Sequence, residues 1–296
     1  MSLLDKILET KRDDVERAKS ARPLSEIQRR IRDIEKPRSF AKAIESDRFG
    51  IIAEIKKKSP SRAAMYASNV EAAPDAYRDS PLVKAVSVLT DWTYFGMTIE
   101  EMELYKSRIG KPVLRKDFIF HEYQVWEARA FGADAILLMA SLPKTTKNQL
   151  KGIFDLATEL GMDVLFEVHS EPELRRIPAK AKIVGINSRK LMSSQRSLRY
   201  WLSRVASKFV RDLSTDMDLF EELIDKLPKG VLRIAESGVS PNQISKIRDL
   251  GFNCALIGTS LLQSSLGVRE TLKQFEDALR ESSSVVSIPK IAPARV

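Results

Sequence analysis

Short apolar runs recur along the chain, and each is followed by a segment in which apolar residues are spaced as on one face of a helix. The first halves of these runs are apolar at every position, as in "GIIAEIK" and "DAILLMA". This is typical of parallel strands that are buried on both faces. The pattern predicts eight strands, at residues 50–56, 84–90, 112–118, 134–140, 163–169, 182–188, 231–237 and 253–259.

The intervening amphipathic segments have recognisable helix ends. Segment 98–110 finishes at Gly110, and glycine is a common residue just past a helix. Segment 240–251 begins with Ser240 as N-cap and Pro241 in the first turn. Eight strands that alternate with helices predict an α/β fold, the (β/α)8 TIM barrel. A doubly wound open sheet is the alternative, but no G-x-G-x-x-G motif follows a predicted strand.

Three regions lie outside this repeat. Residues 1–49 predict one or two helices as an N-terminal extension of a single barrel domain, 1–281. Residues 282–296 are rich in serine and proline and predict a disordered tail. Residues 192–213 predict a helix inserted after the sixth strand, with an apolar stripe and many arginines beside it. That helix either docks on the barrel or contacts a protein partner, a second subunit or an anionic surface.

The net charge and the rare residue types narrow the class of protein. The formal charge is +9, from 49 lysines and arginines against 40 aspartates and glutamates. The two signs are interspersed, so a small anionic substrate fits better than nucleic acid. One cysteine and two histidines predict no disulfide and no metal site. No signal peptide and no apolar run of roughly 20 residues is present, so we expect a cytoplasmic protein without a membrane contact.

Charged residues end several of the predicted strands, where such barrels have their active sites. The first strand ends on Glu54 and Lys56, the third on Lys116 and Asp117, and the fifth on Glu167. Because side chains alternate along a strand, two lysines and two glutamates can face one another across the mouth. A structural salt bridge is the alternative for each residue, but the whole ring favours proton transfer. A lysine desolvated there is expected to have a lowered pKa.

Small residues at the ends of the seventh and eighth strands predict a second subsite. "ESGVSP" and "LIGTSLL" bring Gly238, Gly258 and Thr259 to the mouth, where backbone N–H groups can approach an anion. Phosphate is the expected ligand in this part of a barrel. Two tight turns are the alternative. Ser59, in "SPS", either adds a hydroxyl to the ligand or belongs to a plain turn.

Eight motifs in order carry a family resemblance: "IIAEIKKKSPS", "SVLTDWTYFG", "PVLRKDFIFHEYQV", "GADAILLMA", "DVLFEVHSEPEL", "VGINSRKL", "RIAESGVS" and "ALIGTSLL". Together with the opening "LLDKILETKRDDVERAK", they resemble indole-3-glycerol-phosphate synthase over roughly residues 3 to 280, apart from the insertion. The resemblance implies a lyase of tryptophan biosynthesis that needs no metal and no cofactor. It converts 1-(2-carboxyphenylamino)-1-deoxyribulose 5-phosphate to indole-3-glycerol phosphate by ring closure, decarboxylation and dehydration.

The resemblance also implies roles for individual residues. Lys116 is the general acid at the ketone, and Glu167 is the candidate general base. Glu54 and Lys56 take part in proton transfer and in binding the substrate carboxylate, and Asn187 orients the intermediate. The remaining expected contacts are Arg189 and Ser237 near the substrate, Phe95 and Phe118 as aromatic walls, and Ser59, Gly238, Gly258 and Thr259 around the anion.

One loop departs from the family pattern, and two rival functions stay open. The family has a glycine soon after "SPS", whereas this chain has Arg62-Ala63-Ala64, which predicts a stiffer loop. Phosphoribosylanthranilate isomerase would need a cysteine or aspartate base at the end of the first strand, where this chain has Glu54. A non-catalytic barrel that binds a partner through the basic insertion is the other rival.

Overall fold

The computed structural model describes residues 3–46, 48–60, 64–189 and 217–284. Eight parallel strands close into a barrel in the order β1 to β8, which confirms the predicted (β/α)8 fold. Each strand lies within two residues of its predicted bounds. They are β1 (Gly50–Ile55), β2 (Val83–Leu89), β3 (Val113–Lys116), β4 (Ala135–Met139), β5 (Asp163–Val168), β6 (Ile183–Asn187), β7 (Leu232–Glu236) and β8 (Cys254–Ile257).

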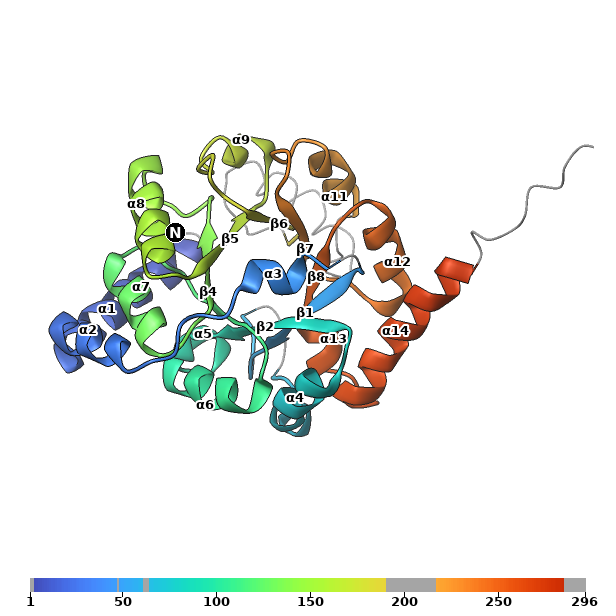
Figure 1. Cartoon of the computed structure of the whole chain (residues 1–296), viewed down its shortest axis with the longest axis horizontal. Helices are drawn as coiled ribbons and strands as arrows, with labels where there is room; N and C mark the ends of the chain where they lie inside the picture. The colour runs from blue at the N-terminus through green and yellow to red at the C-terminus, as the bar shows by residue number, and fades with distance from the viewer. Residues whose placement is uncertain (1–2, 47, 61–63, 190–216, 285–296) are drawn as a thin grey trace, which may run out of the picture.

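Helices surround the barrel (Figure 1). The predicted ends of α6 (Ile99–Ile109) and α12 (Pro241–Asp249) are confirmed: Gly110 ends α6 in the left-handed conformation at φ 68°, and Ser240 is the N-cap of α12, with Pro241 in its first turn. Thr98 and Glu101 also form a capping box at the start of α6. In the described ranges, the helices after β1 are α4 (Ala67–Asp79), α5 (Trp92–Phe95), α6 (Ile99–Ile109), α7 (Glu122–Ala130), α8 (Lys147–Glu159), α9 (Glu171–Leu174), α11 (Met217–Ile224), α12 (Pro241–Asp249), α13 (Thr259–Leu262) and α14 (Val268–Ser284).

A short helix, α3 (Phe40–Ile44), closes the end of the barrel where the strands begin. Phe40 and Ile44 are fully buried and pack against interior side chains such as Ile52 and Leu165. The Asp163 carboxylate, at the start of β5, accepts a hydrogen bond of 2.9 Å from the backbone N–H of Ala41. Figure 1 looks onto this end, with α3 lying across the middle of the ring of strands.

The first helix, α1 (Leu3–Ala21), reaches the opposite end of the barrel, whereas α2 (Leu24–Arg32) packs beside α7. Lys11 is buried in α1, and its Nζ lies 2.8 Å from Asp91 Oδ2 and 2.9 Å from Asp117 Oδ1. Asp91 lies two residues past the end of β2, and Asp117 directly follows the end of β3. The extension therefore packs against the two strand ends through a buried ion-pair cluster.

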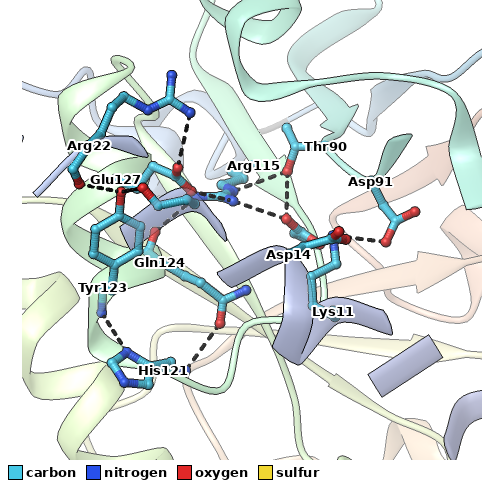
Figure 2. A network of polar contacts seen from close by, with 12 residues as sticks. Lys11, Asp14, Arg22, Thr90, Asp91, Arg115, His121, Tyr123, Gln124 and Glu127 are labelled. Atoms are coloured by element: carbon cyan, nitrogen blue, oxygen red, sulfur yellow. Dashed lines mark hydrogen bonds and ion pairs between the residues drawn. The ribbon is translucent and has the colours of Figure 1, made fainter. Parts of the chain in front are cut away.

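Figure 2 shows how this cluster continues into α7. The Arg115 guanidinium donates to Thr90 Oγ1 at 3.0 Å and to the Gln124 carbonyl at 2.9 Å. It also lies 3.0 Å from both Asp117 and Glu127. The adjacent charges of the "RKD" motif thus separate: Arg115 and Asp117 join β3 to its neighbours, and Lys116 alone points into the barrel.

Several predicted features lie outside the described residues. These are the inserted helix at 192–213, positions 62 and 63 of the first loop, and the tail from 285 onward; α14 itself continues to Ser284, past the expected boundary at 281. In the described ranges, no helix is long and apolar enough to cross a membrane.

Candidate active site

A cavity of about 750 Å³ opens where the strands end. Twelve of the thirteen predicted site residues line it: Glu54, Lys56, Phe95, Lys116, Phe118, Glu167, Asn187, Arg189, Ser237, Gly238, Gly258 and Thr259. Ser59 is the exception. It is buried just beyond β1, and its hydroxyl has no hydrogen-bond partner among the described residues. The strand-end residues predicted to form a ring therefore line one and the same cavity.

Side-chain alternation explains why these polar residues meet. Ile52 and Leu165 point into the barrel core, so the residues two positions later, Glu54 and Glu167, point into the mouth. The even-numbered strands β2 and β4 bring Leu89 and Met139 to the same level. The charged groups are thus set among apolar walls, where water screens charge poorly and each interaction is strengthened.

Lys116 lies between carboxylates from other strands. Its Nζ is 3.3 Å from Glu167 Oε2 and 3.8 Å from Glu236 Oε2. Burial alone would lower the pKa of Lys116, but the negative charges of Glu167 and Glu54 outweigh it and raise the pKa. The prediction of a lowered pKa is therefore wrong for this lysine, which carries its proton throughout the physiological pH range.

The second lysine follows the prediction. Lys56 is buried, and its Nζ lies 2.5 Å from Glu54 Oε1. Burial lowers its pKa, and the neighbouring cations Arg189 and Lys116 add to this, so the attraction of Glu54 does not restore the ordinary value. The pKa of Glu54 is lowered as well, because Lys56 and Lys116 together outweigh its own burial. Lys56 is thus the lysine of this cavity whose proton is more easily released.

Glu236 is a cavity residue that was not among the predicted site residues. It ends β7 and lines the mouth between Asn187 and Leu256, its neighbours on β6 and β8. Burial and the adjacent Glu167 raise its pKa well above the ordinary value. The same two-residue spacing that selected Glu167 would have found it, since Ile234 points into the core.

Glu167 and Glu236 form an unequal pair of carboxyl groups. The pKa of Glu167 is lowered to about 2: burial opposes this shift, but Lys116 and His169 outweigh it. Two adjacent carboxyl groups in a poorly solvated site cannot both ionise without cost, so one keeps its proton. The site therefore holds an ionised carboxylate, able to accept a proton, beside a neutral carboxylic acid, able to donate one.

Two glycines give these carboxylates their space. A Cβ on Gly258 would lie 2.9 Å from Glu54 Cβ, with the Glu54 carboxylate closer still. A Cβ on Gly185, in β6, would lie 3.0 Å from Glu236 Cδ. Real Cβ atoms do not approach other heavy atoms this closely. Gly258 was predicted as part of an anion site, and in the structure it also makes room for a glutamate.

The cavity is flanked by an aromatic pair and by a strained turn. The ring centroids of Phe95 and Phe118 are 6.4 Å apart, with an interplanar angle of 35°. On the other side, Ser237 and Gly238 both have positive φ, at 75° and 67°. A serine in this conformation costs free energy and is a mark of functional sites. Asn187 accepts a 3.0 Å hydrogen bond from the backbone N–H of Arg189, which fixes its amide.

The described residues contain no group of three His, Cys, Asp or Glu side chains able to hold a metal ion. The rival base of an isomerase is also misplaced: Cys254 is fully buried in β8, and burial raises its pKa to about 12. What remains is an arrangement of two lysines and three glutamates beside an aromatic pair, suited to acid–base chemistry on an anionic, partly aromatic molecule.

Comparison with known proteins points to one family. The sequence profile of the indole-3-glycerol phosphate synthase family matches residues 4–201 and 202–275, with its break inside segment 192–213. The chain is 33% identical to the indole-3-glycerol phosphate synthase of Bacteroides thetaiotaomicron, covering 94% of this chain and 99% of the relative. It is 37% identical to indole-3-glycerol phosphate synthase 2 of Ralstonia nicotianae, covering 95% and 96%.

Solved structures share the fold at low sequence identity. The 3-hexulose-6-phosphate synthase of Salmonella typhimurium has a TM-score of 0.55 at 12% identity, over 79% of this chain and 99% of that one.

Fold and cavity together define a (β/α)8-barrel enzyme whose cavity, lined by lysines and carboxyl groups, lies at the C-terminal ends of its strands. With the profile match and relatives above 30% identity over most of its length, the chain belongs to the indole-3-glycerol phosphate synthase family.

Proposed function

We propose that this chain catalyses the reaction for which its family is named, as a carboxy-lyase of tryptophan biosynthesis. The substrate is 1-(2-carboxyphenylamino)-1-deoxyribulose 5-phosphate, and the products are indole-3-glycerol phosphate, carbon dioxide and water. The observation that carries the proposal is the cluster of Lys116, Glu167 and Glu236 in one cavity. The alternative of a non-catalytic binding protein is not favoured, because every curated relative cited above is named as the synthase.

The substrate carries two anionic ends and an aromatic ring, and the cavity offers a place for each. We assign the ring to the space beside Phe95 and Phe118. The substrate carboxylate then lies toward Lys56 and Arg189, which supply positive charge. The phosphate lies at the β7 and β8 ends, where Gly238 and Thr259 line the cavity. Backbone N–H groups at such turns bind phosphate.

Ring closure joins the ring carbon that bears the carboxylate to the ketone carbon. Negative charge develops on the ketone oxygen as this bond forms. We assign Lys116 as the proton donor to that oxygen, because its raised pKa keeps it charged until the oxygen becomes strongly basic. Asn187, whose amide is fixed by Arg189, then orients the resulting hydroxyl.

Loss of carbon dioxide follows, because the ring can regain its aromaticity only when the carbon–carboxylate bond breaks. The electron pair of that bond returns to the ring. Apolar side chains such as Leu89 and Met139 line the cavity and exclude water from the carboxylate.

Dehydration needs a base for a proton on the carbon next to nitrogen and an acid for the departing hydroxyl. We assign the base to Glu167, whose lowered pKa keeps it ionised. We assign the acid to Lys56, because its lowered pKa makes its proton available. Glu236, neutral by virtue of its raised pKa, donates a hydrogen bond to the substrate beside them.

The test is a fluorescence assay with the anilinodeoxyribulose phosphate, without added metal, that follows the indole product. Wild type should turn over, and Lys116→Ala should lose at least about 100-fold in kcat. Lys229→Ala, an exposed lysine on the loop before β7, is the matched control and should keep the wild-type rate. Wild-type protein that is folded but makes no product would refute the proposal.

We place the enzyme in the cytoplasm, where the reactions of amino-acid biosynthesis take place. We also propose that the basic segment 192–213 contacts a protein partner or a second copy of the chain. This segment lies outside the described residues, so its apolar stripe and arginines support the proposal from sequence alone.

A further inference from the structure

We propose that His169 is a positioning residue for Glu167. Its imidazolium orients this carboxylate and stabilises its negative charge from the side that faces away from the substrate cavity. The inference rests on the proposed function, in which Glu167 is the catalytic base. It assigns a task to one of only two histidines in the chain.

The two oxygens of Glu167 face two different cationic groups. Oε2 lies 3.3 Å from Lys116 Nζ, inside the cavity. Oε1 lies 3.4 Å from His169 Nε2, an ion-pair distance, and this buried nitrogen makes no hydrogen bond to any described residue. His169 itself lies outside the cavity lining formed by the described residues. Glu167 is thus held between a group that meets the substrate and a group that does not.

His169 is fixed in turn by groups from two further segments. Its Nδ1 lies 3.4 Å from Ser141 Oγ, in the loop after β4, and 3.6 Å from Glu173 Oε2, in α9. Glu173 also accepts hydrogen bonds from the His169 backbone N–H at 2.8 Å and from Ser170 Oγ at 2.9 Å. With its Nδ1 side engaged in this way, the ring presents Nε2 to Glu167.

The charges around the ring favour its protonated form. Burial lowers the pKa of His169, but Glu173 and Glu167 outweigh burial, and the more distant Lys116 only partly opposes them, so the pKa is raised above 6.5. A raised histidine pKa means that the cation is present below that value and is lost as the pH rises through it. Glu167 then keeps Lys116 as its partner but loses His169.

A purely structural task, as a cap for α9, is the competing explanation. It predicts that His169 would not respond to the ionisation of Glu167. His121 shows what such a histidine looks like: it begins α7, its Nδ1 accepts a 3.0 Å hydrogen bond from the Tyr123 backbone N–H, and burial lowers its pKa. The two histidines of the chain should therefore titrate on opposite sides of 6.5.

The first test is an NMR titration of the imidazole signals in full-length ¹⁵N-labelled protein. Two sets of signals are expected, and His121→Gln assigns them by removing one. The midpoint of His169 should lie above that of His121. Glu167→Gln should lower the His169 midpoint by about 1 pH unit, because it removes a nearby negative charge. An unchanged midpoint in Glu167→Gln would overturn the proposal, and Glu173→Gln checks that the signal reports on its neighbours.

The second test is the pH dependence of turnover. His169→Gln keeps a hydrogen-bonding group without the charge, and its kcat should fall about tenfold with KM within about twofold of wild type. Wild-type kcat should decline as pH rises through the His169 midpoint, and the variant should lack this decline. His121→Gln should match wild type throughout. A His169→Gln variant with the wild-type kcat and pH profile would overturn the inference, whereas absence of turnover in wild type would instead refute the proposed function.

Discussion

Glu54 on β1 lies beside Gly258, the residue that directly follows the adjacent strand β8, and the carboxylate of Glu54 occupies the space that a side chain at position 258 would need. A Cβ there would come within 2.9 Å of Glu54 Cβ. Gly258 has a negative φ of −127°, so the obstacle to a larger residue is space rather than backbone conformation. The position of the Glu54 carboxylate thus depends on the absence of a neighbouring methyl group.

Gly258→Ala should therefore displace Glu54 and its partner Lys56. Because a displacement of about 1 Å in an active site can cost about 100-fold in rate, we expect a kcat loss of that order. Gly152→Ala is the control: Gly152 lies within α8, and a Cβ there would meet no described atom within 4 Å. It should keep kcat and gain up to about 1 kcal/mol in free energy of unfolding. Wild-type kinetics in Gly258→Ala would show that Glu54 is not needed where it lies.

Glu236→Gln should make the protein more stable and less active. The folded state holds the Glu236 proton to a higher pH than the unfolded state does, so this residue costs stability as the pH rises above its ordinary pKa of 4.5. The amide removes that cost. Urea unfolding should show a gain of about 1 kcal/mol at pH 8, and little gain near pH 4. A gain that is equal at both pH values would contradict the raised pKa, and kcat should fall at least about 100-fold.

Lys11→Met should loosen the N-terminal helix. The change leaves Asp91 buried without this cation, and among the cations of the described residues Asp117 keeps its ion pair with Arg115. Removal of one partner from a buried ion pair costs about 3–5 kcal/mol, which urea unfolding would detect. Lys19→Met, which breaks the exposed pair with Glu16, is the control and should change stability by less than about 1 kcal/mol.

The same variant should affect the substrate pocket. The Asp91 side chain accepts a 2.7 Å hydrogen bond from the Tyr94 backbone N–H and so caps α5, the helix that carries Phe95. Asp117 directly precedes Phe118 in the chain. KM for the anilino substrate should therefore rise in Lys11→Met. An unchanged KM would show that the aromatic pair is positioned without the N-terminal helix.

Ser237→Gly should relieve the backbone strain at this position and, at the same time, weaken substrate binding. The serine has a φ of 75°, which glycine adopts without the steric cost, so the free energy of unfolding should rise by about 1 kcal/mol. The melting temperature should rise by about 2 °C. Loss of the hydroxyl should raise KM about fivefold, the effect of one hydrogen bond to the substrate. A fall in melting temperature would mean that the Ser237 hydroxyl stabilises the free enzyme.

The sequence was sufficient where the structure depends on local periodicity. The eight strands followed from apolar runs, and alternation along each strand correctly placed Glu54, Lys116 and Glu167 on the inner side of the barrel. The same rule explains Asp117. One residue after Lys116, it points the other way, and its partner Lys11 comes from a helix that the strand pattern says nothing about.

The pKa shifts of the site and the role of Gly258 could not be predicted from the sequence, because they depend on distances between residues of different strands. The raised pKa of Lys116 needs the carboxylates of Glu167 and Glu54 within reach at once, and these come from two different strands. Glu236 was visible as a strand-end residue, but its special property, a retained proton, comes from the proximity of Glu167. Gly258 likewise looked like a phosphate ligand because nothing local marks it as the neighbour of Glu54.

The helix α3 restricts the path by which substrate enters the barrel and products leave it. Phe40 and Ile44 fill the barrel end where the strands begin and leave no solvent-exposed surface of their own. Substrate, indole product and carbon dioxide must then all pass through the opposite end, beside the charged ring. Because the cavity then has a single opening, catalysis depends on the order in which the products leave. Carbon dioxide and water either pass the bound indole product on their way out or leave after it has dissociated.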